Sequence, residues 1–365
     1  MPKRNAENER MKRAYLIWMR DAKGRSEATL DIAAAAIDRF QTHTGFKPFK
    51  SFRLEQATSF KADLARRPSP ASGKPLSKAT LYGALKATQA FFEWLSRETG
   101  YRQSVRLSDA EYFTLNRNDA RVATAARERP SPSLEQVQHV LRRMPIATAL
   151  ERRDRALIAF ILLTGMRDAA VISLKLKRLD LARRQVSQDA RDVKTKAAKT
   201  FTSSFFPVGG DVESMVRDWV DELNLVHLFG PDDPVFPATR IGLDEEGQFQ
   251  AAGFNREHWA QASPVRAIFK KAFEAAGLPY FYPHSLRRTL MRLAYDLQLT
   301  QREAKAWTQS LGHDSALTSL VSYGALTRDE QSDAMAGISA RKANPDPETE
   351  AIIKAVFALI SRRNS

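Results

Sequence analysis

A polar stretch over residues 116–133 divides the chain into two parts that must fold separately. Its sequence, NRNDARVATAARERPSPS, is rich in charge, ends in Pro and Ser, and has only weak apolar periodicity. Such composition is typical of an interdomain linker. Directly after it, Ser133 and Gln136 form the capping-box pattern that opens an amphipathic helix. We therefore expect a first domain over residues 1–118, a linker over 119–132 and a second domain over 133–365.

The apolar spacing predicts helices on both sides of this linker. Residues 28–40 and 79–95 carry apolar side chains every three to four positions, and Ser77 is placed to cap the second of these helices. In the second domain, RALIAFILLTGM predicts a buried helix. Short runs of β-branched and aromatic residues around KAAK then predict a hairpin. Helical patterns resume after Gly210, so the expected fold class is mainly α with a small antiparallel β-sheet.

Charge indicates a polyanionic partner. The chain carries a formal charge of +15, most of it before residue 130, which favours nucleic acid or an anionic membrane surface. The apolar run AYLIWM is too short for a membrane span or a signal peptide, so we expect a cytoplasmic protein without a membrane partner. Lys74, Lys78 and Lys86 are candidates for contacts with nucleic-acid phosphates, and the alternative is that they form a solvated helix face.

Several chemistries are missing from the residue inventory. Without cysteine, the chain has no thiol nucleophile, disulfide or cysteine-based zinc site. Its six histidines do not form the HExxH pattern, and neither a Walker loop nor a dinucleotide glycine loop is present. We therefore expect neither a metal nor another cofactor, and any phosphate chemistry must depend on ordinary side chains.

Three segments carry the residues suited to such chemistry. LLTGMRDAAVISLKLKRLD contains Arg167, HSLRRT contains His284 and Arg287, and LGHDSALTSLVSY contains His313 and Tyr323. His284 and Arg287 are three apart and share a helix face, whereas Arg288 does not. Taken singly, each has an ordinary interpretation, such as an arginine at a helix C-terminus or a loop histidine. In this order the three segments resemble the motifs of the tyrosine recombinase, or phage integrase, family.

This resemblance implies a two-domain, C-shaped clamp around duplex DNA and a mechanism. A tyrosine attacks a DNA phosphodiester and forms a 3′-phosphotyrosyl bond, while arginines meet the extra charge on the phosphoryl oxygens. Tyr323 would be the nucleophile and His313 a donor to phosphate or tyrosine. A tyrosine with its ordinary pKa near 10 needs a proton acceptor, for which His284 is the candidate. The implied catalytic residues are Arg167, Lys196, His284, Arg287, His313 and Tyr323.

The lysine is the general acid that would protonate the departing 5′ oxygen. TKAAK resembles the hairpin lysine pattern of the family and favours Lys196. Counting back from Pro207 favours Lys199 instead, and Lys194 is close by. Lys199 is otherwise a candidate DNA contact, together with Lys74, Lys78 and Lys86.

Three departures from the family pattern mark a divergent member. Ala170 stands where a glutamate is usual, so a supporting carboxylate is missing unless Asp168 replaces it. The interval from His313 to Tyr323 is one residue longer than expected, and the hairpin is also longer.

The expected partners are double-stranded DNA and further copies of this chain. The resemblance implies a dimer on one site and a tetramer in synapsis, joined through the amphipathic segment TEAIIKAVFALISRR at residues 349–363. Two alternatives remain: a type IB topoisomerase that relaxes DNA as a monomer, and a DNA-binding protein without catalysis. The terminal amphipathic segment and the lack of a long linker insertion favour the recombinase.

Overall fold

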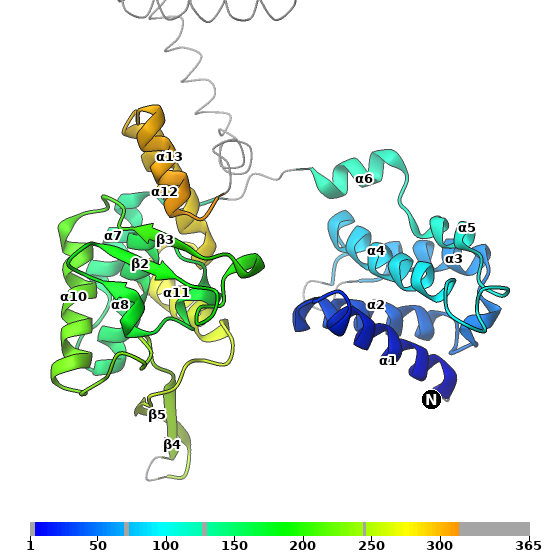
Figure 1. The fold of residues 1–365 in the computed structure, drawn as a ribbon, viewed down its shortest axis with the longest axis horizontal. Coiled ribbons are helices and arrows are strands. Elements are labelled where there is room, and N and C mark those ends of the chain that lie inside the picture. Colours follow the sequence, from blue (N-terminus) through cyan, green and yellow to red (C-terminus); the bar gives the residue numbers. More distant parts are fainter. Residues whose placement is uncertain (1–3, 69–72, 126–129, 244–245, 314–365) are drawn as a thin grey trace, which may run out of the picture. The chain divides into compact units, whose positions relative to one another are not determined.

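The computed structural model describes residues 4–68, 73–125, 130–243 and 246–313. It divides into two compact units, Met1–Arg127 and Glu128–Ser365 (Figure 1). None of the described helices is both long and apolar enough to cross a membrane.

All the named elements in the described residues of unit 1 are helices. Ser77 caps α4 as expected, because its hydroxyl accepts a hydrogen bond from the Thr80 amide at 3.2 Å. A cluster of buried phenylalanine rings forms the core, and Phe40 meets Phe92 edge-to-face at a centroid distance of 4.9 Å. Such pairs add to the free energy gained by burying the rings. The helices are α1 (Ala6–Asp21), α2 (Glu27–His43), α3 (Leu54–Arg66), α4 (Lys78–Leu95), α5 (Leu107–Ala110) and α6 (Arg117–Thr124).

Helix α6 occupies residues that we expected to be linker. Asn116 caps it by accepting a hydrogen bond from the Asp119 amide at 2.8 Å. Asp119 also pairs with Lys78 of α4 at 2.9 Å, and α6 packs against α4. The cap and these contacts offset the weak apolar periodicity, so the chain stays helical past residue 118. The assignment of DNA clamping to residues 1–118 remains a prediction.

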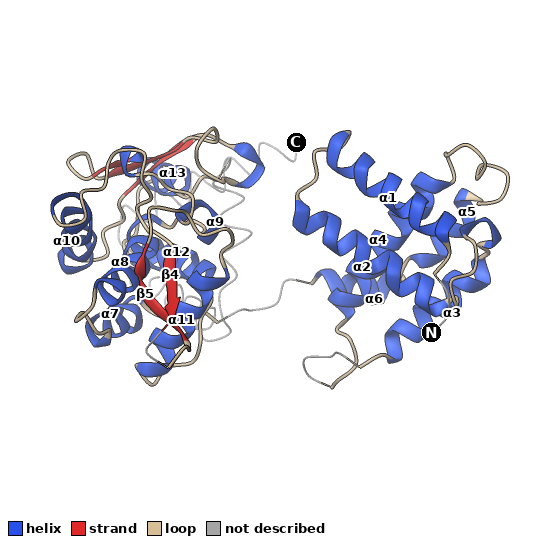
Figure 2. Cartoon of the chain, turned by 90° about the horizontal axis from the view of Figure 1, so that it is seen from below, coloured by secondary structure: helices blue, strands red, loops and turns tan. Residues whose placement is uncertain are grey.

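Unit 2 is organised around helix α8. The expected capping box of α7 is present: Ser133 Oγ accepts from the Gln136 amide at 3.2 Å, and the Gln136 side chain accepts from the Ser133 amide at 2.9 Å. Residues 156–164 of α8 are all buried, as its nearly continuous apolar sequence predicts. Among the described residues of this unit, the helices of eight or more residues are α7 (Leu134–Arg143), α8 (Ala149–Thr164), α10 (Gly210–Leu225), α11 (Ser263–Ala275), α12 (Leu286–Asp296) and α13 (Gln301–Ser310). Helices α7, α10 and α12 pack against α8, as Figure 2 shows.

The described strands form two small antiparallel sheets. The first has the order β1-β2-β3 and pairs Val186 with Ser203. The second, a two-stranded ribbon that we did not expect, projects from the helical body of unit 2 (Figure 1). Its side chains are largely exposed, Phe249 at 84%, so it lacks the alternating burial that signals a strand. The strands are β1 (Leu179–Asp180), β2 (Gln185–Gln188), β3 (Phe201–Ser204), β4 (Thr239–Leu243) and β5 (Phe249–Phe254).

Candidate active site

Glycine at the end of α8 brings two distant segments together. Gly165 has φ +61° and closes the helix in the left-handed region, where glycine is favoured. A Cβ at this position would lie 2.5 Å from Leu311 Cδ2. The left-handed φ and this close contact together favour glycine, and the contact sets the ends of α8 and α13 against each other.

The guanidinium of Arg287 joins three of the segments identified in the sequence. Arg287 lies in the first turn of α12 and is only 2% exposed. Its Nη1 donates to the Gly165 carbonyl at 2.5 Å, and its Nη2 donates to the Leu311 carbonyl at 2.6 Å. The same Nη2 lies 2.7 Å from His313 Nε2. An arginine does not lose its proton in proteins, so this buried group brings a fixed positive charge to the place where the segments meet.

The contact with Arg287 also fixes the state of the His313 ring. A guanidinium can only donate, so Nε2 must be the acceptor. The ring proton of a neutral His313 then lies on Nδ1, where it can be donated to a phosphate oxygen. Gly312 precedes it with φ +69°, and a Cβ there would fall on the ring of Phe201 in β3. Arg287 therefore holds Nε2 of the ring, and the close contact between Gly312 and Phe201 holds the adjoining backbone against β3.

Arg167 lies two residues beyond Gly165, at the N-cap of the short helix α9 (Asp168–Val171). Its side chain is half-buried and makes no hydrogen bond or ion pair with any described residue. Asp168 pairs with Arg266 of α11 at 3.2 Å, and its negative charge also acts on His284, where it opposes the lowering of the pKa. Ala170 is buried in the core of unit 2.

His284 lies in the 3-10 turn Pro283–Ser285 that precedes α12. Its ring is partly exposed, and its partial withdrawal from water is the largest cause that lowers its pKa to about 4. The charges of Arg287, Arg167 and Arg288 lower it further, since they disfavour a second positive charge. The effect of Arg167 places this arginine in the electrostatic surroundings of His284. His284 is therefore neutral at physiological pH.

The candidate lysines all lie on the connection between β2 and β3, residues 189–200. Lys196 is exposed in the turn Lys196–Ala198 and makes no hydrogen bond or ion pair with a described residue. Lys194 is also exposed, and its amide donates to Ser173 Oγ at 2.8 Å. Lys199 lines an open pocket of about 450 Å³ together with Gly312 and His313. The structure thus brings Lys199, rather than Lys196, to the His313 segment.

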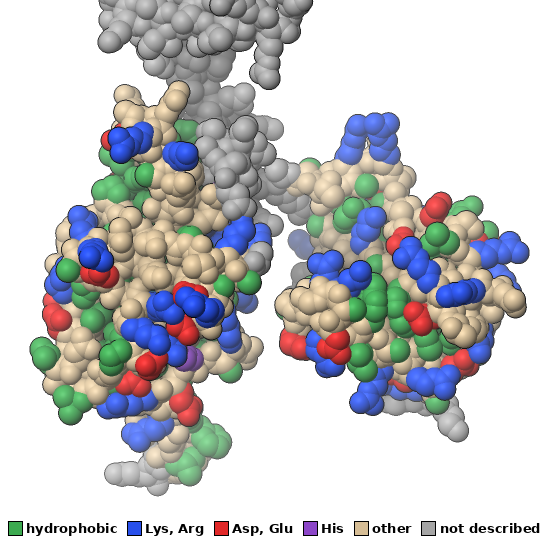
Figure 3. All heavy atoms as spheres, viewed as in Figure 1, with side chains coloured by type: hydrophobic (Ala, Val, Ile, Leu, Met, Phe, Trp, Pro, Cys, Tyr) green, Lys and Arg blue, Asp and Glu red, His purple; other side chains and the backbone are tan. Residues whose placement is uncertain are grey.

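Some expected site residues lie elsewhere. Tyr323 and the terminal segment 349–363 fall outside the described residues. In unit 1, Lys78 is engaged with Asp119, Lys86 lies 6.0 Å from the centre of the Tyr82 ring, and Lys74 is exposed. On the faces visible in Figure 3, basic side chains alternate with acidic ones and do not form a continuous basic patch.

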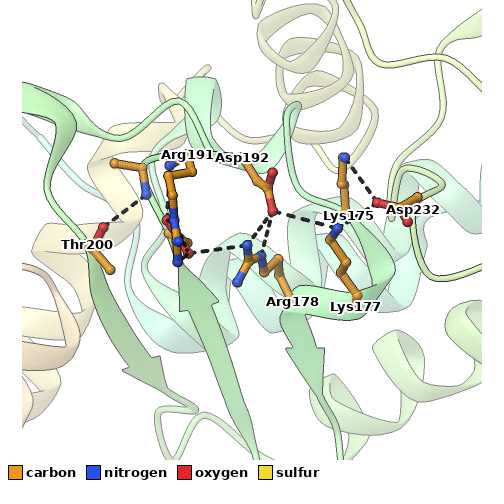
Figure 4. A network of polar contacts seen from close by, with 9 residues as sticks. Lys175, Lys177, Arg178, Arg191, Asp192, Thr200 and Asp232 are labelled. Carbon is orange, nitrogen blue, oxygen red and sulfur yellow. Dashed lines mark hydrogen bonds and ion pairs between the residues drawn. The ribbon is translucent and has the colours of Figure 1, made fainter.

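A charged network beside the site was missed in the sequence. Arg178 forms an ion pair with Asp192 and lies 3.3 Å from a second carboxylate, that of Asp189 (Figure 4). Beside it, Lys177 lies 2.7 Å from Asp232. The signal that was available is the mixture of opposite charges in LKLKRLD and QDARD.

Among the described residues, no cluster of acidic residues and histidines is arranged to hold a metal ion.

Comparison with known proteins identifies the family. The phage integrase family model matches residues 133–329, which is more than half of the chain. The chain belongs to the phage integrase family. The match begins at the residue that caps α7. It confirms the family expected from the motifs and, with it, the expected class of enzyme, a site-specific tyrosine recombinase.

Relatives and solved structures agree with this assignment. "Tyrosine recombinase XerC" of Alcanivorax borkumensis is 23% identical over 283 residues, which cover 77% of this chain and 78% of that protein. The fold also resembles that of the XerH site-specific recombinase bound to a palindromic difH substrate, with a TM-score of 0.60 and 16% sequence identity. The match covers 91% of this chain and 84% of the XerH chain. A lambda integrase dimer bound to a core site gives TM-score 0.58 and 16% identity, with coverage of 86% and 94%. These structures confirm the predicted fold class.

Proposed function

We propose that this recombinase cuts and rejoins DNA through a covalent bond between Tyr323 and a 3′ phosphate. The observation that carries the proposal is the Arg287 guanidinium, which is bonded to Gly165, Leu311 and His313. One buried cation thereby unites the segments that hold Arg167, His284 and His313. A fixed positive charge in a partly desolvated site is suited to the negative charge that develops during phosphoryl transfer.

In the proposed reaction, Tyr323 Oη attacks phosphorus and the bond from phosphorus to the 5′ oxygen breaks. The tyrosine loses its proton, and the departing 5′ oxygen gains one. Arg167 and Arg287 bind the non-bridging oxygens, and His313 donates from Nδ1 to the same phosphate. Rejoining is the reverse process, in which a 5′ hydroxyl attacks the phosphotyrosine and releases the tyrosine.

His284 has a more restricted role than the sequence suggested. A base whose pKa is about 4 is a poor acceptor for a tyrosine proton. A phosphate bound among Arg167, Arg287 and Arg288 would offset their charges and raise the pKa of His284. We therefore propose that His284 becomes an effective base only after DNA is bound.

We propose Lys199 as the acid, in place of Lys196, because it shares a pocket with His313. A DNA whose bridging 5′ oxygen is replaced by sulfur separates the two lysines. A thiolate leaves without protonation, so loss of the acid is relieved on this substrate. We expect Lys199→Ala to cut ordinary DNA slowly and the sulfur substrate at nearly the wild-type rate. If instead Lys199→Ala cuts ordinary DNA normally, and the sulfur substrate restores cleavage by a slowed Lys196→Ala, then Lys196 is the acid.

The central test is formation of a covalent complex. The full-length protein is incubated, in EDTA, with a nicked duplex carrying its site, identified beforehand by selecting bound duplexes from a random pool. We expect a protein–DNA band that resists denaturation, absent in Tyr323→Phe and retained in the control Tyr295→Phe, which changes an exposed tyrosine of α12. If wild-type protein binds in a salt-sensitive way but forms no such band, the non-catalytic alternative is correct.

Oligomerisation distinguishes recombination from simple relaxation. The similarity to a lambda integrase dimer bound to a core site supports a dimer on DNA. We propose a tetramer in synapsis, with residues 349–363 as the contact between subunits. Truncation after Asn344 should leave cleavage intact and reduce assembly. Relaxation of supercoiled plasmids without the site and without assembly would instead indicate the topoisomerase alternative. Closing of both units around one duplex remains a prediction.

A further inference from the structure

The connection that carries the candidate lysines begins with a network of ion pairs. Asp189 directly follows β2 and is only 4% exposed. Arg178 Nε donates to Asp192 at 2.9 Å, and its Nη2 lies 3.3 Å from Asp189 Oδ2. Arg191 Nη2 donates to the same Asp189 oxygen at 2.6 Å. One arginine from the segment before β1 therefore bridges two carboxylates of the lysine-bearing connection.

Asp189 also organises the backbone of this connection. Its carbonyl accepts hydrogen bonds from the amides of Asp192 at 3.0 Å and Val193 at 2.8 Å. The Ala190 amide donates to Thr200 Oγ1 at 3.1 Å, which ties the beginning of the connection to its end (Figure 4). The lysines at positions 194, 196 and 199 thus extend from a loop whose two ends are joined.

The same connection is tethered to the segment that follows Arg167. The Lys194 amide donates to Ser173 Oγ at 2.8 Å, and Ser173 Oγ in turn donates to the Ala170 carbonyl at 3.0 Å. Ala170 belongs to α9, and Arg167 occupies the position directly before that helix. Ser173 therefore links the β2–β3 connection to the helix that follows Arg167.

The chemistry of the network favours a geometric role. A hydrogen bond from Arg191 holds the pKa of Asp189 well below its usual range, and one from Arg178 lowers the pKa of Asp192. Both carboxylates are therefore ionised wherever the enzyme works. The side chains of Arg178 and Asp192 are about a fifth exposed, and ion pairs that solvent reaches add little free energy to folding. Their arrangement does, however, restrict the direction in which the loop presents its lysines.

We propose that Arg178, Asp189 and Asp192 are positioning residues that hold the β2–β3 connection so that its lysine can protonate the departing 5′ oxygen. As the bond from phosphorus to that oxygen breaks, the lysine ammonium gives its proton to the oxygen and becomes a neutral amine. This inference rests on the proposed function. According to this proposal, Arg178 before β1 and the two aspartates after β2 together hold the lysine that donates the proton.

The test compares single-turnover cleavage of ordinary site DNA with cleavage of DNA carrying a 5′ bridging sulfur. Asp189→Asn and Arg178→Gln should slow cleavage of ordinary DNA by roughly 10- to 100-fold, as expected for a misplaced catalytic group. On the sulfur substrate both should approach the wild-type rate, because that leaving group needs no proton. Asp180→Asn is the matched control, since Asp180 lies at the far end of the same sheet, opposite Gln185, and it should leave both rates unchanged.

Two results would overturn the inference. One is wild-type cleavage of ordinary DNA by both positioning variants. The other is equal slowing on both substrates, which indicates a general structural defect. If Asp189→Asn fails to fold, Arg178→Lys, which keeps the charge but loses the planar bridge, is compared in the same way. Failure of the proposed function is separate: wild-type protein then forms no covalent complex, or neither lysine variant is relieved by sulfur.

Discussion

The arginine part of the site and the lysine part are held by different forces. Arg287 is buried, and its neighbours are backbone carbonyls at helix ends that glycines allow to approach. The lysines lie on a surface connection, where the partly exposed side chains of Arg178 and Asp192 pair with each other and Arg178 also reaches the buried Asp189. Close packing fixes the first part, whereas charge attraction and a few loop hydrogen bonds hold the second.

This difference matches the tasks that we assign to the two parts. Positive charge must already be in place when the transition state forms, because reorganising it during the reaction would cost free energy. A lysine acid must reach one oxygen as its bond to phosphorus breaks, so the direction in which the connection presents the lysine matters. A packed cation site beside a lysine connection held by ion pairs is consistent with both needs, and the two parts should respond differently to mutation and salt.

The largest effect should come from removing the cation at the centre of the rigid part. Arg287→Ala leaves the Gly165 and Leu311 carbonyls without their buried donor, so unit 2 should lose roughly 2–5 kcal/mol of stability. Hydrogen exchange of the α8 amides measures this loss. Arg288→Ala, at the half-exposed neighbouring position, is the control and should cost much less. Equal losses would show that Arg287 is no special anchor.

The next largest effect should follow from filling the glycine contact with β3. Gly312→Ala combines a left-handed backbone with a clash against Phe201, so we expect a loss of about 2–4 kcal/mol. Gly277→Ala, at φ +75° with open space around it, carries only the backbone strain and should cost about 1–2 kcal/mol. Thermal unfolding of both variants checks the difference. Partial recovery in Gly312→Ala with Phe201→Leu would identify the ring as the obstacle.

A third test concerns the electrostatics of His284. Ring NMR should give a pKa of about 4 in the free protein. Because the unfolded ring takes up a proton first, this group should reduce the stability of unit 2 as pH falls from about 6.5 towards 4. Arg167→Gln and binding of site DNA should each raise the pKa, whereas Arg143→Gln on α7 should not. An unchanged pKa in Arg167→Gln would place that arginine away from the ring.

The smallest effect should separate the two parts by salt. Raising NaCl from about 0.1 to 1 M shortens the screening length from roughly 10 to 3 Å. Amides of residues 190–200 should then exchange a few-fold faster, while those of α12 around Arg287 should not change. A uniform response of both segments would contradict the distinction between packing and charge.

Much of the fold could be predicted because its signals are local. The capping box of Ser133 and Gln136 depends on two residues three apart, and it is present. The apolar run of α8 likewise predicts its own burial. Helix α6 was missed because it depends on a contact with Lys78, which lies far from it along the chain. The ribbon β4–β5 was missed because neither of its faces is buried at the tip.

The candidate site was predictable in kind but not in arrangement. The motifs indicated Arg167, His284, Arg287 and His313, yet they did not show that Asp168 would pair with Arg266. They also favoured Lys196, whereas Lys199 lines the pocket beside His313. Ion-pair partners and pocket walls come from other elements, so residue spacing does not determine them.

By itself, the sequence determined which groups the site could use: arginines that stay charged, the histidines at positions 284 and 313, and the candidate lysines. It also excluded cysteine. It also determined the local helices, because caps and apolar periodicity act over a few residues. Only the tertiary structure decided that Arg287 would bond to carbonyls 122 and 24 residues away, and that His284 would be kept neutral. The physical reason is that hydrogen bonding, burial and electrostatic shifts depend on distance in space, which close packing of α8, α12 and α13 establishes.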